Sequence, residues 1–140
     1  MEPSNGDGGP LTRRARELQT RQADFHASFS EALKLVASNP ADALGRIIAC
    51  ETKADALFRD QEQFLRDMGE WGLSQIPQLQ TDADETRIQL LYGRGQAHSL
   101  VGHLLEARAA YEQALTIVGD RPHMAKPMLR MALAQVAAQQ

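Results

Sequence analysis

The spacing of apolar and small residues between Ile88 and Gly119 is the feature that most restricts how this chain can fold. Such residues line one face of a helix before Gly102, mostly three or four positions apart, and a second row follows it, which is typical of amphipathic helices that bury one face. The rows are Ile88, Leu91, Gly95 and Val101, then Leu104, Ala107, Tyr111, Ala114, Leu115 and Val118. The stretch therefore predicts two helices joined by a tight turn at Gly102. Small residues would let the two backbones approach, and Tyr111 would fill the space between them.

The order of these residues resembles the tetratricopeptide repeat, a helix–turn–helix unit of about 34 residues. The most specific part of the resemblance is Gly102-x-Leu104-x-Glu106-Ala107-x-x-x-Tyr111-x-x-Ala114-Leu115. Three positions depart from the family pattern: Arg94 replaces Leu, His98 replaces Tyr and Gly119 replaces Pro. The resemblance covers residues 88–121 and implies an all-α, right-handed array of antiparallel helical hairpins. An ordinary amphipathic helical hairpin is the alternative for the same spacing.

The N-terminal half predicts a long helical hairpin at residues 11–68, after a polar, Gly-rich tail at residues 1–10 that we expect to be disordered. The first helix, 11–37, carries a heptad-like apolar row interrupted by Gln22. That row is Leu11, Ala15, Leu18, Phe25, Phe29, Ala32 and Val36. It can pack on its own domain, or it can pair with another chain as a coiled-coil arm. Asn39 and Pro40 then predict the start of an antiparallel helix that ends near Met68.

Residues 69–81 predict a connector, because Pro77 blocks a continuous helix. Its tryptophan, Trp71, is expected to fill the gap between the two hairpins, with an exposed interface position as the alternative. A helix beginning at Asp82 would then open the repeat-like hairpin, residues 82–121. A last helix, 126–140, would cap the exposed face of that hairpin. Its methionines, Met124, Met128 and Met131, can serve as adaptable packing or as a partner surface. Residues 11–140 thus predict a single helical domain.

Composition argues against several classes of function. The net charge is −3 and the pI is about 5.8, so nucleic acid is not the expected partner. Cys50 is the single cysteine, and no apolar run is long enough to span a membrane. No phosphate-binding glycine loop or nucleophile elbow is present. His98 and His103 are five residues apart, which predicts different sides of one helix and no paired metal ligands. We therefore expect a cytoplasmic protein without enzymatic activity, metal or cofactor.

The resemblance implies a protein–protein interaction adaptor, or a small subunit of a larger assembly, that binds a peptide or helix in a groove. Carried over residue by residue, the groove positions are Gln89, Tyr92, Gln96, Ser99 and Leu100. The best-known variant of this groove grips a C-terminal carboxylate with Lys and Asn. Tyr92 and Gln96 stand at those positions here, so we expect no such clamp. The alternative function is structural: a homo-oligomer formed through Leu11, Leu18, Phe25 and Phe29.

Overall fold

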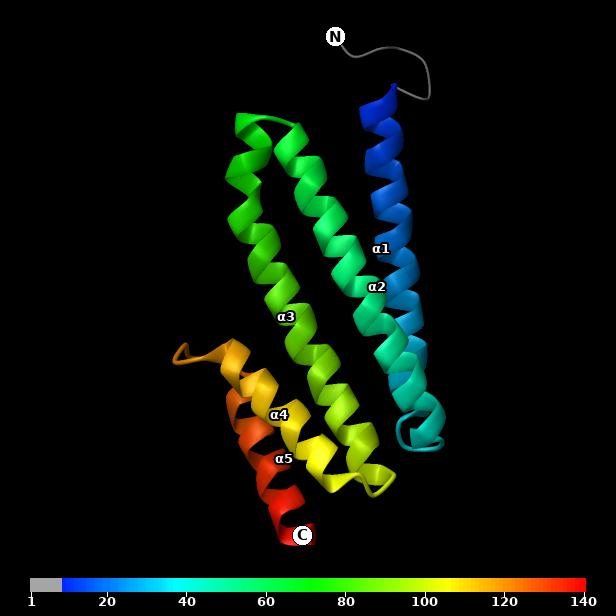
Figure 1. The fold of residues 1–140 in the computed structure, drawn as a ribbon, viewed down its shortest axis with the longest axis vertical. Coiled ribbons are helices and arrows are strands. Elements are labelled where there is room, and N and C mark those ends of the chain that lie inside the picture. Colours follow the sequence, from blue (N-terminus) through cyan, green and yellow to red (C-terminus); the bar gives the residue numbers. More distant parts are fainter. Residues whose placement is uncertain (1–8) are drawn as a thin grey trace.

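The computed structural model describes residues 9–140, so most of the predicted tail at residues 1–10 lies outside the described residues. Within this range the chain is all-α, with five helices packed side by side in sequence order as antiparallel hairpins (Figure 1). The helices are α1 (Pro10–Leu35), α2 (Pro40–Asp67), α3 (Glu70–Leu100), α4 (Leu104–Val118) and α5 (Ala125–Gln139). The bounds of α1 and α2 lie within two residues of those predicted for the hairpin 11–68, and the bounds of α5 lie within one residue of those predicted for the last helix, 126–140.

The first hairpin forms where the turn signals predicted it. Asn39 caps α2, because its side-chain oxygen accepts a hydrogen bond from the Asp42 amide at 3.3 Å. Phe25 and Phe29 of α1 are buried, and they belong to an apolar cluster that α1, α2 and α3 share. We call this the first cluster. Most of the heptad-like row thus packs on its own chain, whereas Leu11 at its beginning remains exposed.

The predicted connector at residues 69–81 is wrong, because α3 starts at Glu70 and continues through Pro77 to Leu100. Proline removes one backbone hydrogen bond from a helix, but packing against α2 outweighs this local break. Gly72 lies so close to α2 that a methyl group there would overlap the carbonyl oxygen of Leu65. Ile76 is buried one turn later. The second hairpin therefore begins at Glu70 and not at Asp82.

Trp71 does not fill a gap between the hairpins, because its side chain is 60% exposed. Successive residues of a helix point about 100° apart, and Gly72 is the residue that faces α2 at this level. Trp71 and Leu73 on either side of it therefore point outward. Trp71 is exposed, as the alternative requires, and its role at an interface stays a prediction.

The repeat-like stretch forms the predicted turn and packing. Gly102 has φ of 88°, a left-handed conformation that favours glycine. Tyr111 is buried, and its ring lies against the backbone of α3 at Gly95. Ala107 and Ala114 are inaccessible to solvent. Together with buried residues of α5 they form an apolar cluster that joins α3, α4 and α5, which we call the second cluster.

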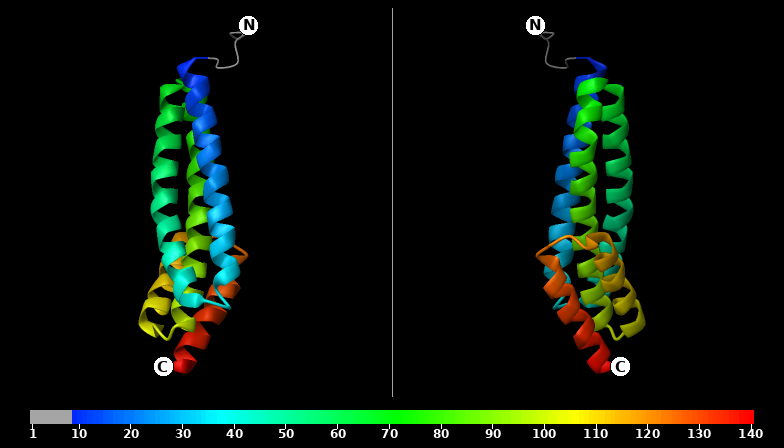
Figure 2. Two further views of the ribbon diagram at one scale, coloured as in Figure 1. Left: turned by 90° about the vertical axis from the view of Figure 1, so that its right-hand side faces the viewer. Right: turned by 90° about the vertical axis from the view of Figure 1, so that its left-hand side faces the viewer.

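The longest helix, α3, contributes to both clusters and is central in the array. Figure 2 shows that α1 and α5 lie on one side of α3, whereas α2 and α4 lie on the other. Helix α3 therefore has one side between α1 and α5, where Gln89 and Leu100 are exposed, and one side between α2 and α4, where Arg87 is exposed.

Candidate interaction surfaces

The five residues predicted to line a groove do share one side of α3. Gln89, Tyr92, Gln96 and Ser99 follow each other at intervals of three or four, and Leu100 adjoins Ser99. Gln89 is exposed and Leu100 is 58% exposed, whereas the other three are half-buried. This set is called the α3 row below.

Contacts at its two borders place the α3 row on the side of α1 and α5. Leu33 of α1 lies against the α3 backbone at Gly93, and Leu100 follows two helical turns later on the same side. Glu85 precedes Gln89 by one turn, and it contacts His123 just before α5. The row is therefore flanked by neighbouring helices, and Leu33 and Leu100 add exposed apolar surface along one border.

Tyr92 is less available than the resemblance implies. Its ring centroid lies 5.9 Å from that of Tyr111, and its side chain packs against the second cluster. Burial raises the pKa of the Tyr111 hydroxyl to about 12, with a smaller contribution from Tyr92. Gln89 and Leu100 are consequently the members of the α3 row that are most open to a partner.

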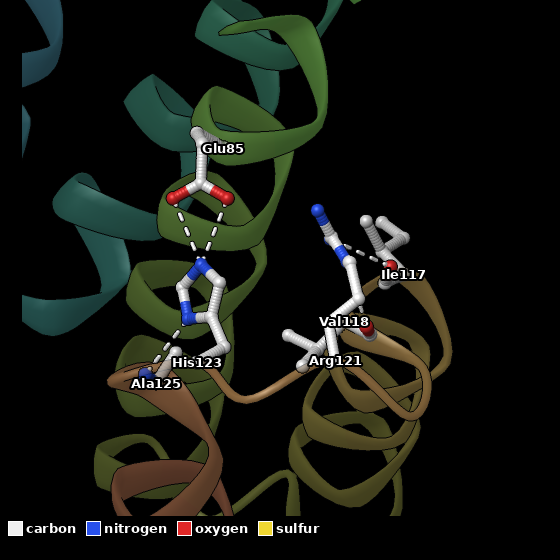
Figure 3. A network of polar contacts seen from close by, with 6 residues as sticks. All are labelled: Glu85, Ile117, Val118, Arg121, His123 and Ala125. Atoms are coloured by element: carbon white, nitrogen blue, oxygen red, sulfur yellow. Dashed lines mark hydrogen bonds and ion pairs between the residues drawn. The ribbon is translucent and has the colours of Figure 1, made fainter. Parts of the chain in front are cut away.

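A polar network fixes the loop between α4 and α5 beside this side of α3 (Figure 3). The Ala125 amide donates to Nδ1 of His123 at 2.9 Å, so the ring proton must lie on Nε2. Nε2 then donates to the Glu85 carboxylate at 2.8 Å. Arg121 donates to the carbonyl oxygens of Val118 and Ile117 at the end of α4. These contacts hold the start of α5 against α3.

The opposite side of α3 contains a cavity of about 440 Å³ between α2, α3 and α4. Two ion pairs cross its wall: Arg94 lies 3.0 Å from Glu51, and Arg87 lies 2.6 Å from Asp55. Burial raises the pKa of Glu51 even though Arg94 is beside it. Leu90, Leu91 and Ile117 supply the apolar lining, and Gln113 and Thr116 of α4 supply uncharged polar groups. The sequence did not predict this cavity, because its lining residues are scattered over three successive helices, from Glu51 to Ile117.

His98 and His103 lie close together, contrary to the prediction that they point to different sides. The turn at Gly102 folds the chain back, and the Nδ1 atoms of the two rings are 3.3 Å apart. His98 is buried, and burial lowers its pKa, as do Arg94 and His103 to a smaller extent. One neutral ring can donate a proton to the other, so the pair is a hydrogen bond across the turn.

Comparison with known proteins gives no assignment. No family model matches the sequence, and neither a curated protein nor a solved structure is significantly similar to it. Among residues 9–140, no three His, Cys, Asp or Glu side chains are grouped so that they could hold a metal ion. None of the helices in the described range is long and apolar enough to cross a membrane.

Proposed function

We propose that this protein is an interaction module that binds a helix of a partner protein on the α3 row, between α1 and α5. The observation that carries the proposal is the position of Gln89, Gln96 and Leu100 on the central helix, flanked by two helices that leave Gln89 and Leu100 exposed. The α3 row carries no charge, which suits an apolar or amphipathic helix better than a charged peptide tail. The protein would then act as an adaptor or as a small subunit of a larger assembly.

The same proposal treats the α3–α4 hairpin as a tetratricopeptide-like repeat. Its support is the packing of Gly95, Ala107, Tyr111 and Ala114, which fill the positions that the repeat uses for close helix contact. Further support is the alternation of the helices, because α1, α3 and α5 would line the inner side of such an array and α2 and α4 the outer side. Under this proposal Tyr92 and Gln96 stand at the positions where a carboxylate clamp has Lys and Asn, which argues against such a clamp.

The cavity bordered by α2 and α4 is a second candidate for the partner site. Its volume of about 440 Å³ and its apolar lining would accept one large side chain of a partner helix. Arg94 and Arg87 are already paired with Glu51 and Asp55, so the cavity offers no uncompensated charge to a ligand, and Nε of Arg94 is its one buried side-chain donor without a partner among the described residues. The α3 row therefore remains our first choice.

The test is a selection of helical peptides against the protein, followed by affinity measurements on two matched double variants. Q89E/L100E adds two acids to the α3 row, and Q113E/T116E adds two acids beside the cavity; all four positions are exposed. We expect Q89E/L100E to lower the affinity for the selected peptides at least ~10-fold, which corresponds to about 1.4 kcal/mol. Q113E/T116E should leave this affinity unchanged. Weaker binding by Q113E/T116E, with the affinity of Q89E/L100E unchanged, would show that the partner binds at the cavity instead. Failure to select any peptide would contradict the proposed function.

A further inference from the structure

The outward face of α5 carries a row of exposed, uncharged residues that no other segment of residues 9–140 covers. The inward face is Ala125, Leu129, Ala132 and Val136, which are buried in the second cluster. Met124, the residue before α5, is 87% exposed, and on the outward face of the helix Met128 is 46% and Met131 64% exposed. The exposed Ala134 and Ala138 continue the row. Figure 2 shows α5 at the edge of the array.

The intervals between the residues of the row are the same from either end. Its members are Met124, Met128, Met131, Ala134 and Ala138, and the intervals between them are four, three, three and four residues. Intervals of three and four keep all five on one helical face. A face with this symmetry fits an antiparallel copy of itself when the two helices cross at Met131.

Such a pairing is complementary in size. Met128 would lie opposite Ala134 of the second copy, and Met124 opposite Ala138, so each long side chain meets a small one. Met131 would meet its own counterpart on the two-fold axis. Flexible methionine side chains adapt to such contacts, and alternating large and small residues lets facing helices interdigitate.

The charges are compatible with a second copy as the occupant. The charged residues of α5 are Lys126 and Arg130, and neither belongs to the row. An uncharged face suffers no like-charge repulsion when it meets itself. In an antiparallel pair, moreover, the N-terminus of each helix lies beside the C-terminus of the other, which favours their dipoles. We propose that the outward face of α5 is a homodimer interface, with two α5 helices antiparallel about Met131.

The expected dimer is weak. Helix α5 has 15 residues, a length of about 22 Å. One helix pair of this length buries less than the roughly 800 Å² per partner of a standard interface. We therefore expect a dissociation constant on the order of 10–100 µM. This interface differs from an oligomer through α1, where Phe25 and Phe29 are already buried within the chain.

The test uses the self-pairing of residue 131. Sedimentation equilibrium of the full chain should show a dimer, and M131E and M131K should each be monomeric, with helicity by circular dichroism unchanged. An equimolar mixture of M131E and M131K should dimerise again, because opposite charges then meet on the axis. L105E is the matched control, since Leu105 is 71% exposed on α4, and it should dimerise like the unaltered chain.

Three results would overturn the proposal. The first is a chain that stays monomeric up to ~1 mM. The second is a dimer that persists in M131E, which would locate association elsewhere, such as Leu11 and Leu18 of α1. The third is a mixture of M131E and M131K that stays monomeric.

Discussion

Both clusters mix alanines with larger apolar residues, but the first contains the stacked Phe25 and Phe29, whereas the second contains Tyr111 packed against the backbone of α3 at Gly95. Phe25, Phe29 and Ile47 occupy the space between α1, α2 and α3. In the second cluster, Ala107 and Ala114 bring α4 close to its neighbours, and Tyr111 lies directly against α3. The first cluster should therefore be sensitive to the loss of volume, and the second to its addition. Because α3 belongs to both clusters, a destabilising substitution in either one should lower the free energy of unfolding of the whole array.

The largest effect should come from removing volume in the first cluster. Phe29 is 6% exposed and stacks on Phe25 with ring centroids 5.9 Å apart. Phe29→Ala should lower the free energy of unfolding by roughly 3–5 kcal/mol, since it removes apolar contacts and leaves a cavity. Urea denaturation followed by circular dichroism measures it. A loss below ~1 kcal/mol would mean that the first cluster collapses around the cavity, which would contradict its expected sensitivity to the loss of volume.

Adding one methyl group in the second cluster should have the next largest effect. At Gly95 a Cβ atom would lie 2.5 Å from Cε1 of the buried Tyr111 ring. Gly95→Ala should therefore destabilise the protein by about 1–3 kcal/mol through overpacking, despite the better helix propensity of alanine.

Gly45→Ala is the matched control for this experiment. Gly45 also lies inside a helix, but a Cβ there has no neighbour within 4 Å. The substitution should stabilise the protein by roughly 0.5–1 kcal/mol, because alanine reduces the conformational freedom of the unfolded chain. Equal effects at Gly45 and Gly95 in the same denaturation assay would show that the second cluster is not tightly packed.

A smaller, pH-dependent effect should arise at the turn that closes the α3–α4 hairpin. The pKa of His98 is lowered in the fold, chiefly by burial, so the folded protein favours the neutral ring. Its contribution is complete above the unfolded pKa of about 6.5 and decreases as the pH falls through that value toward the lower folded pKa. His98→Gln should flatten the dependence of unfolding free energy on pH in this window. An unchanged slope would rule out His98 as its source.

The smallest effect should come from an ion pair between helices. Arg87 and Asp55 lie 2.6 Å apart, but their side chains are 56% and 59% exposed. Solvent screens such pairs, so Arg87→Ala should change the free energy of unfolding by no more than ~1 kcal/mol. A larger loss in the denaturation assay would show that charge, and not the large side chains of the first cluster, holds α2 to α3.

Local signals in the sequence predict some parts of the fold and not others. The contact between α3 and α4 in the second cluster was predictable, because its signals lie close together in the chain. They are the turn at Gly102 and the helical spacing of Ala107, Tyr111 and Ala114, whose sizes favour close helix contact. The start of α3 was not predictable, because Pro77 is a local signal that favours a break. The packing of Gly72 and Ile76 on α2, which outweighs it, is a tertiary effect.

The spacing of residues predicts which side chains share a face of a helix better than it predicts which side chains are exposed. Helical spacing was enough to group Gln89, Tyr92, Gln96 and Ser99. It could not show that Tyr92 packs on Tyr111, that His98 meets His103 across the turn, or that three helices line an open cavity. Those features depend on how helices cross, which no single periodicity contains.

The most direct test of the central claim is a nuclear magnetic resonance titration with a selected helical peptide. The side-chain amides report on the two faces of α3: Gln89 and Gln96 lie in the α3 row, and Gln113 lines the cavity. We predict large shifts for Gln89 and Gln96 and none for Gln113. Shifts confined to Gln113, with Gln89 and Gln96 unchanged, would contradict the claim that a partner helix binds between α1 and α5.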